Sequence, residues 1–305
     1  MINFILIGFC IAVGFLLKAF KLVPDNAHKG INTWIIYMAI PAVALKYIPA
    51  ITWSNDLLLP AIMPVIVWSG SWLLFKVYSL RFNISPTTRA ALTLTCGLGN
   101  TSFVGFPLVQ AYYGEHAISI AVISDQVTFV LMATVGAMMA MNASNHKGLD
   151  LKTVPLKLIQ FPPFVASILA LILPRFVDLT PLNPIFDKIA VTLVPLALFT
   201  VGLQLNFTGW QSEIKLLTIG LSYKLILAPV MIIGVALILH LKGIVPQIAV
   251  FEAAVAPMIT AAVLADQYNL NSKLANLMVG TGILLSLITT GVWYIVLQHL
   301  AAPGS

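Results

Sequence analysis

Apolar segments long enough to cross a lipid bilayer follow one another along almost the whole chain. A helix needs about 20 mostly apolar residues to span the hydrocarbon core. Ten segments meet this requirement, at roughly residues 2–18, 31–49, 57–80, 88–112, 116–142, 154–174, 185–206, 214–240, 246–267 and 273–299. We therefore expect an all-α polytopic membrane protein with ten transmembrane helices, numbered 1 to 10 in chain order.

The composition agrees with a lipid environment. Of the 305 residues, 60% are hydrophobic and 9% are charged, whereas a soluble domain carries about 25% charged residues. The net charge of +6 does not predict a nucleic-acid partner, because the basic residues lie in the connectors. Cys10 and Cys96 both lie in apolar runs, which predicts buried thiols rather than a disulfide or a metal site. The first apolar run predicts a transmembrane helix rather than a removable signal peptide, because no charged segment precedes it.

Lysine and arginine are unequally divided between the two sides of the predicted membrane domain. Connectors 1, 3, 5, 7 and 9, with the adjoining helix ends, hold Lys18, Lys21, Lys29, Lys76, Arg81, Arg89, Lys147, Lys152, Lys157, Lys215, Lys224 and Lys273. The other side holds Lys46, Arg175, Lys188 and Lys242. The positive-inside rule then places the odd connectors in the cytoplasm and both termini outside it. We expect a multi-pass protein of the cell (inner) membrane.

The central connector, residues 143–153, divides the ten helices into five and five. An odd number of helices per half inverts the second half in the membrane, as in inverted-repeat transporters. We expect a first repeat at residues 1–145 and a second at residues 154–299. Weak internal similarity supports this division, because residues 40–45 and 194–199 share a proline at their second position in helices 2 and 7.

Helix 4 contains an unusual concentration of residues that disfavour a regular helix. Residues 96–107 read CGLGNTSFVGFP, with three glycines, and Pro107 removes a backbone donor. Freed backbone groups are not tolerated in lipid, so a break here must line a protein cavity or a bound ligand. The alternative is a kinked helix in which small residues allow close packing.

Helix 9 is the expected counterpart of helix 4. Residues 251–262 read FEAAVAPMITAA, with Pro257 near the middle of the span and Glu252 before it. A carboxylate at this depth is costly and is a functional candidate, as a ligand of Na⁺ or a carrier of a proton. The alternative is a glutamate near the external end, hydrated or paired with Lys242.

Helix 5 supplies the second candidate for ion coupling, Asp125, with Gln126 beside it. A buried aspartate must be paired, bound to a cation or protonated. The alternative is a packing contact to backbone freed by the break in helix 4, and both interpretations place Asp125 against helix 4. Lys224 is expected to extend towards the cytoplasmic interface.

Two broken helices that meet would provide complementary charges. The N-termini of half-helices attract an anion, and exposed carbonyl and side-chain oxygens attract a cation. This arrangement favours a secondary transporter of an anion over a passive channel or uniporter, and over a membrane sensor without transport. No nucleotide-binding or catalytic motif is present, so we expect no enzyme activity and no cofactor other than Na⁺.

The chain resembles the auxin efflux carrier family in its prokaryotic members. The resemblance spans nearly the whole sequence and is carried by residues 36–42, 100–108 and 264–268, and by Pro195, Gly202 and Pro257. It implies a scaffold of helices 1, 2, 6 and 7 and a mobile transport domain of helices 3–5 and 8–10. It also implies that substrate binds where helices 4 and 9 cross, with an elevator-type mechanism. A homodimer through the scaffold helices is one assembly that such a chain could form.

The resemblance also suggests the ligands. Prokaryotic relatives are associated with malate, malonate and similar carboxylates, so we expect a small organic anion, a carboxylate of this kind or an auxin-like acid. Phe103 stands where plant carriers have a proline, so the break is expected at Gly105 and Pro107. The more distant bile acid/sodium symporter family has a sodium-binding glutamate about where Glu252 stands, which implies symport with Na⁺. The alternative coupling ion is a proton, carried by Asp125 or Glu252.

These arguments define the expected site. The substrate-binding residues are Asn100, Thr101, Ser102, Gly105, Pro107, Pro257, Met258 and Thr260. The ion-coupling residues are Asp125, Gln126 and Glu252, and a sodium ion would be held by Glu252, Asn100 and Asp125.

Overall fold

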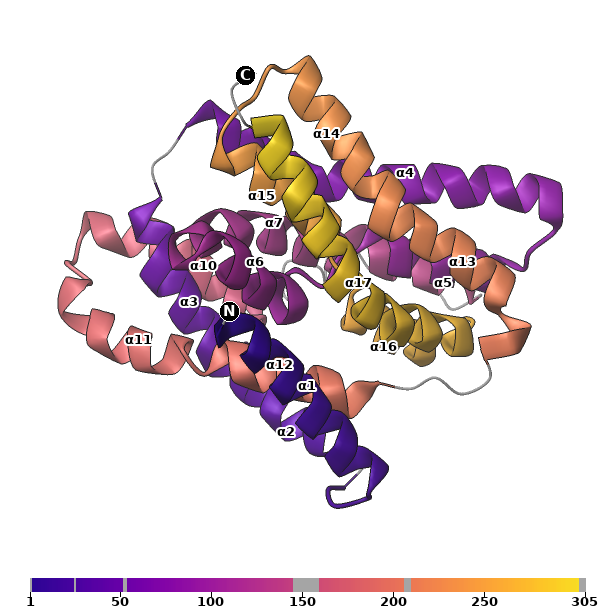
Figure 1. Ribbon diagram of the computed structural model, residues 1–305, viewed down its shortest axis with the longest axis horizontal. Coiled ribbons are helices and arrows are strands. Elements are labelled where there is room, and N and C mark those ends of the chain that lie inside the picture. Colours follow the sequence, from indigo (N-terminus) through magenta and orange to yellow (C-terminus); the bar gives the residue numbers. More distant parts are fainter. Residues whose placement is uncertain (1, 25, 52–53, 145–158, 206–209, 302–305) are drawn as a thin grey trace. The chain divides into compact units, whose positions relative to one another are not determined.

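The computed structural model describes residues 2–24, 26–51, 54–144, 159–205 and 210–301. Within these ranges the chain is helical and contains no β-strand (Figure 1), which confirms the expected all-α class. A single isolated antiparallel bridge joins Gly99 and Pro257. The central connector between the two expected repeats falls largely outside the described residues.

Six helical segments in the described residues are long and apolar enough to cross a membrane. They are Ala27–Ala50, Asn55–Phe82, Glu115–Ala143, Thr180–Gln204, Ile214–Ile238 and Ser272–Leu300. Three shorter apolar helices, Ile5–Ala19, Pro162–Arg175 and Ile244–Ala253, lie in three further expected spans. The chain is thus a multi-pass membrane protein, and the inverted arrangement of ten helices stays a prediction.

The first of two compact units comprises Met1–Trp53, Ser102–Val122 and Pro155–Leu205. Its helices are α1 (Ile2–Ala19), α2 (Ala27–Trp34), α3 (Ile40–Tyr47), α6 (Phe106–Tyr113), α10 (Pro162–Ile172), α11 (Asn183–Ala190) and α12 (Leu193–Gln204), with the first residues of α7 (Ile118–Leu131). Helices α1 and α12 lie side by side (Figure 1). Their backbones approach so closely that a Cβ on Gly14 would collide with the Phe199 carbonyl, and one on Gly202 with the Ile11 carbonyl.

The second unit comprises Ser54–Thr101, Ile123–Val154 and Asn206–Ser305. Its helices are α4 (Leu58–Phe82), α5 (Pro86–Gly97), α8 (Ala137–Ala143), α13 (Ile214–Ser222), α14 (Ala228–Ile238), α15 (Ile244–Ala253), α16 (Ile259–Gln267) and α17 (Ser272–Ala301), with the rest of α7. Helix α5 packs against α4, α16 and α17, and α15 packs against α4 and α14. The short helices α5 and α15 thus both pack against the long helix α4.

Local sequence explains where several of these helices begin. The Ser85 side chain accepts a hydrogen bond from the Thr88 amide, and Pro86 occupies the first turn of α5. The Asn271 side chain accepts a bond from the Leu274 amide at the start of α17. Both arrangements satisfy amides that have no partner inside the helix.

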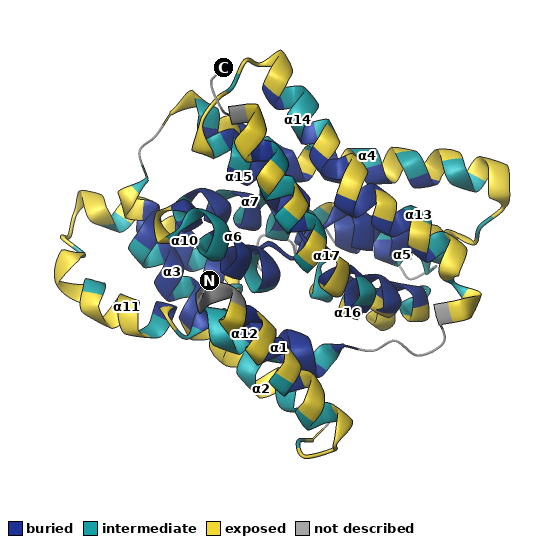
Figure 2. Ribbon diagram, viewed as in Figure 1, coloured by how far each residue is buried: buried dark blue, intermediate teal, exposed yellow. Residues whose placement is uncertain are grey.

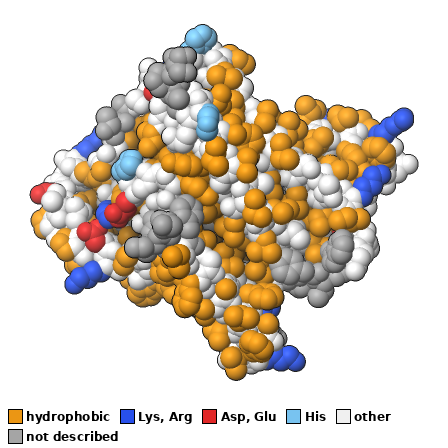
Figure 3. All heavy atoms as spheres, in the orientation of Figure 1, with side chains coloured by type: hydrophobic (Ala, Val, Ile, Leu, Met, Phe, Trp, Pro, Cys, Tyr) orange, Lys and Arg blue, Asp and Glu red, His pale blue; other side chains and the backbone are white. Residues whose placement is uncertain are grey.

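The burial pattern separates an enclosed core from apolar surfaces. Residues 90–97 of α5 and 248–253 of α15 are buried, whereas α14 and α17 carry exposed stripes (Figure 2). Large apolar side chains on these stripes are open to the surroundings, including Leu237, Ile238 and Ile288. Hydrophobic side chains cover much of the face shown in Figure 3. An exposed apolar surface of this extent is expected where lipid, and not water, is the solvent.

The break in the expected helix 4 does not lie where the sequence predicted it. Helix α5 ends at Gly97, the backbone is extended at Leu98, and a π-helical turn, η4 (Thr101–Gly105), leads directly into α6. Pro107 lies in the first turn of α6, where its missing amide hydrogen has little cost. The break at Gly105 and Pro107 is therefore wrong, and the interruption lies at residues 98–100. The break predicted at Pro257 is present, between α15 and α16.

Candidate functional site

The two helix interruptions of the second unit hydrogen-bond to one another through their backbones. The Asn100 amide donates to the Ala256 carbonyl at 2.8 Å, and the Met258 amide donates to the Leu98 carbonyl at 2.9 Å. These reciprocal bonds flank the facing pair Gly99 and Pro257. Backbone groups released by each break are satisfied by the other break, as a site buried from both water and lipid requires.

Small residues make this close approach possible. A Cβ on Gly99 would lie 3.1 Å from the Lys224 Nζ and 3.3 Å from a Val255 methyl carbon. A Cβ on Gly282 of α17 would collide with the Pro257 ring. The position of the bridge is therefore set by two glycines, of which the sequence singled out only Gly99.

Asp125 lies against the break in the expected helix 4, as both sequence interpretations predicted. The Thr101 hydroxyl donates a 2.6 Å hydrogen bond to Asp125 Oδ1, and Asp125 is 5% exposed. The Gln126 side-chain amide is 3.5 Å from Asp125 Oδ2. Nearby, the Ser124 hydroxyl donates to the Pro60 carbonyl, which fixes α7 against α4. The carboxylate is thus held beside Asn100 and Thr101 by a defined network.

Glu252 is deeply buried and is not hydrated. It is 1% exposed, and neither carboxylate oxygen has a hydrogen-bond partner among the described residues. No ion pair joins it to Lys242 in the part of the chain that the structure describes. An unpaired buried carboxylate is expensive, so the alternative of a hydrated or Lys242-paired glutamate is wrong.

Lys224 is the residue that sequence reasoning misplaced. Its side chain is 1% exposed and does not reach an interface. The Nζ atom donates a 2.9 Å hydrogen bond to the carbonyl of Ala253, the last residue of α15. A signal was present, because Lys224 interrupts the apolar run of residues 214–240 as Glu252 interrupts that of helix 9.

The second unit therefore contains most of the expected site residues. Its described part brings together Asn100, Thr101, Asp125, Gln126, Glu252, Pro257 and Met258, while Thr260 lies in the first turn of α16 and is exposed. Ser102, Gly105 and Pro107 belong to the first unit. No group of three or more His, Cys, Asp or Glu residues suited to a metal ion occurs in the described ranges.

The first unit encloses a cavity of about 290 Å³ beside α6. Pro107 and Gln110 of α6 line it together with Tyr47, Glu115 and Pro195. The proline-containing segments of the expected helices 2, 4 and 7 thus border one space. Its polar lining distinguishes it from a gap between apolar helices, although only Pro107 was among the expected site residues.

Charged residues at one end of this cavity form a cluster that the sequence did not predict. Lys46 Nζ lies 2.9 Å from Glu115 Oε1 and 2.7 Å from Asp187 Oδ1, and the Tyr47 hydroxyl donates to Glu115. The carboxylates are more than half exposed, so each ion pair contributes only about 0–1 kcal/mol to stability. The cluster connects three segments far apart in the sequence.

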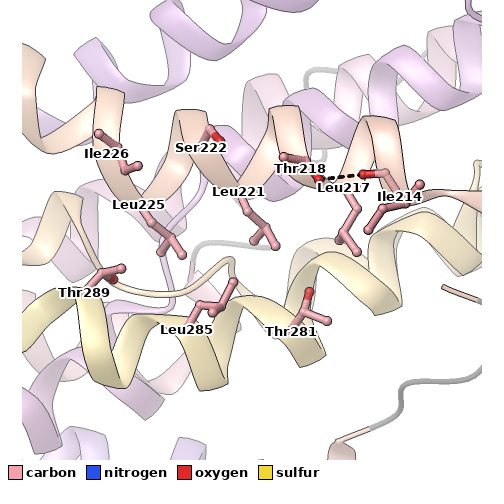
Figure 4. A pocket seen from close by; sticks show the side chains of 10 residues that line it. All are labelled: Ile214, Leu217, Thr218, Leu221, Ser222, Leu225, Ile226, Thr281, Leu285 and Thr289. Atoms are coloured by element: carbon pink, nitrogen blue, oxygen red, sulfur yellow. Dashed lines mark hydrogen bonds between the residues drawn. The ribbon is translucent and has the colours of Figure 1, made fainter. Parts of the chain in front are cut away.

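A further cavity of about 490 Å³ lies in the second unit between α13 and α17 (Figure 4). Leu217, Leu221, Leu225 and Leu285 give it an apolar lining, and no charged residue lines it. The Thr218 hydroxyl bonds to the carbonyl of Ile214 within its own helix. None of the residues at the two breaks lines this cavity, so it is separate from the site that contains Asp125, Glu252 and Lys224.

Comparison with known proteins shows that the chain is similar to membrane transporters. An uncharacterized transporter of Methanothermobacter thermautotrophicus is 23% identical over 94% of this chain and 95% of its own length. A putative malonate transporter of Rhizobium meliloti is 26% identical over 90% of this chain and 88% of its own. A probable auxin efflux carrier component of Oryza sativa subsp. japonica is 29% identical over 46% of this chain and 35% of its own.

The resemblance predicted from the motifs is confirmed at the level of the whole chain. The family described as "Membrane transport protein" matches residues 1–294, which include both helix interruptions and the buried residues around them. The chain therefore belongs to the membrane transport protein family.

Proposed function

We propose that this protein is a secondary active transporter of a small organic anion, such as malonate, malate or an auxin-like acid. The observation that carries the proposal is the reciprocal backbone pairing of Asn100 with Ala256 and of Met258 with Leu98. It holds buried amide, hydroxyl and carboxyl groups at interruptions of two helices, where transporters bind substrates and coupling ions. The names of the Rhizobium and Oryza relatives direct the choice of substrate class.

Asn100 is the proposed centre of substrate recognition. Its side chain is 3% exposed, and the neighbouring Thr101 hydroxyl is engaged by Asp125. An amide side chain can donate to a carboxylate oxygen and accept from a hydroxyl. Pro257 and Met258 at the second interruption complete the proposed substrate site within this unit, and Ser102, Gly105, Pro107 and Thr260 stay candidates from the sequence.

The transport cycle is proposed to be of the elevator type. Helices α1–α3 and α10–α12 occur together in one compact unit, which supports their assignment to a scaffold. The expected helices 3–5 and 8–10 would then form the mobile domain; most of them lie in the second unit, whereas α6 and the start of α7 group with the first. The carboxylates of Asp125 and Glu252, with Gln126 beside them, are the proposed determinants of coupling to Na⁺ or H⁺. The proposed location is the cell inner membrane, with both termini outside the cytoplasm and a homodimer formed through the scaffold.

Uptake of radiolabelled malonate into proteoliposomes tests the proposal. Wild-type protein should accumulate malonate above the external concentration when an ion gradient is imposed, and Asn100→Ala should lose this accumulation. Asn142→Ala, an exposed asparagine of α8, is the matched control and should transport normally. Equilibration without accumulation would identify a channel or uniporter. Normal accumulation by Asn100→Ala would show that the substrate binds elsewhere.

A further inference from the structure

Lys224 places a positive charge directly at the paired helix interruptions. It lies in a π-helical turn, Tyr223–Leu227, a deviation that occurs frequently at functional sites. Its Nζ atom bonds to the Ala253 carbonyl, and a Cβ on Gly99 would lie 3.1 Å from it. The ammonium group therefore bonds to the carbonyl end of α15, before the second interruption, and lies beside Gly99 of the first.

Among the described residues, Glu252 of α15 and Cys96 of α5 act electrostatically on this ammonium, and Asp125 of α7 acts on Glu252. Cys96 of α5 is the remaining ionisable neighbour, and its thiol donates to the Gly220 carbonyl at 3.4 Å. The fixed cation therefore lies near buried Glu252, whose negative charge it offsets, and Asp125 acts on Glu252 with the opposite sign.

The same arrangement argues against a sodium ion at this position. In transporters with broken helices, carbonyls at the C-terminal ends of half-helices coordinate the coupling cation. Here the carbonyl at the end of α15 already accepts a bond from Lys224. A sodium ion beside Glu252 would face the ammonium in a water-poor site, where like charges repel strongly. The residues present do not fit a sodium ion held by Glu252, Asn100 and Asp125.

We propose that the ammonium of Lys224 is a tethered cation that takes the place of a bound sodium ion at the paired interruptions. The inference rests on the proposed function and narrows it, because anion recognition at Asn100 then requires no Na⁺. Lys224 acts as a positioning residue: it holds the carbonyl end of α15 and offsets negative charge, and it need not contact the substrate. The alternative is that Lys224 only caps the end of α15. In that case a small free cation would not restore the stability lost when the lysine is removed.

Thermal melting of the purified protein distinguishes these two roles without any substrate. Wild-type protein should melt at the same temperature in NaCl and in choline chloride of equal ionic strength. Lys224→Ser should melt lower by about 5 °C or more in choline chloride, because buried Glu252 loses its compensating charge. Sodium or methylammonium, which are small enough to enter the vacated space, should restore most of the loss. Lys215→Ser, at an exposed lysine of α13, the helix that leads into the π-helical turn, should show neither effect.

Two outcomes would overturn the inference. One is a higher melting temperature of the wild type in NaCl than in choline chloride. This measurement uses only the wild type, so it can be made even if Lys224→Ser does not fold. The other is a folded Lys224→Ser protein that stays destabilised in both Na⁺ and methylammonium. Lys224→Arg, which keeps the charge, should remain insensitive to Na⁺. Failure of the proposed function would instead appear as absence of malonate transport by a wild type with the expected melting behaviour.

Discussion

Thr101 and Asp125 are joined by a 2.6 Å hydrogen bond from the threonine hydroxyl to Asp125 Oδ1. The bond connects the residue after the first helix interruption to the middle of α7. Both residues are at least 95% buried, so the carboxylate cannot exchange this donor for water without a rearrangement. The position of Asn100, next to Thr101 in the chain, therefore depends on a residue of α7.

Replacing Thr101 by valine tests this dependence. The isosteric side chain lacks the donor, and loss of one bond to a buried carboxylate should cost about 1–3 kcal/mol of stability. Thermal melting should show the loss, and malonate uptake should fall with it, while Thr101→Ser should retain both. Wild-type melting and uptake in the valine variant would show that the hydroxyl is dispensable.

The close contact of α1 with α12 predicts a difference between two glycines of the same helix. Gly14→Ala forces a methyl group into the Phe199 carbonyl and should destabilise the protein by about 1–3 kcal/mol. Gly8→Ala meets no atom within 4 Å and should be neutral or slightly stabilising, because alanine favours helix. Fluorescence-detected size exclusion after graded heating measures both. Equal behaviour of the two variants would contradict the packing of α1 on α12.

Gly282 should influence transport although it offers no side chain to a substrate. Gly282→Ala places a Cβ against the Pro257 ring and should displace the bridge to Gly99. We expect malonate uptake to fall by about tenfold, a cost of about 1.4 kcal/mol. Gly234→Ala in α14 is the control, because nothing lies within 4 Å of an added Cβ there. Full uptake by Gly282→Ala would show that transport does not depend on the position of the Gly99–Pro257 bridge.

The predicted orientation can be checked with single cysteines. Arg81→Cys lies in an odd connector and Arg175→Cys in an even one, and both positions are exposed. A membrane-impermeant maleimide added outside cells should label Arg175→Cys alone, and Arg81→Cys only after permeabilisation. Native Cys10 and Cys96 are buried and should stay unlabelled. The reverse pattern would invert the topology.

Residues whose role follows from their own segment could be predicted from the sequence. Residues whose role depends on contacts with distant segments could not. Pro257 and Glu252 could be recognised because a proline or a carboxylate within an apolar run is exceptional on its own. The break of the expected helix 4 was predicted too far along the chain, at Gly105 and Pro107. A proline is tolerated in the first turn of a helix, and Pro107 lies in the first turn of α6. The pairing of Gly99 with Pro257 depends on contacts that no single segment reveals.

Lys224 and Lys46 also have roles that depend on contacts with distant segments, and neither role was predicted. Lys224 was expected to extend towards the cytoplasmic interface, whereas its Nζ atom bonds to the Ala253 carbonyl in the interior. The Lys46 cluster joins Glu115 and Asp187, which have no periodic relation in the sequence. Hydropathy identifies which segments are buried, but it does not identify which buried polar groups meet.

The reciprocal bonds around Gly99 and Pro257 also constrain how the chain is made. The Leu98 carbonyl and the Asn100 amide leave the ribosome early, but their partners lie at residues 256–258. Until that later segment has been inserted, the first interruption exposes polar backbone inside the bilayer, where it has a high cost. We therefore expect the first interruption to reach its final conformation only after residues 256–258 have been made and inserted, so that the last step of folding involves both halves of the chain.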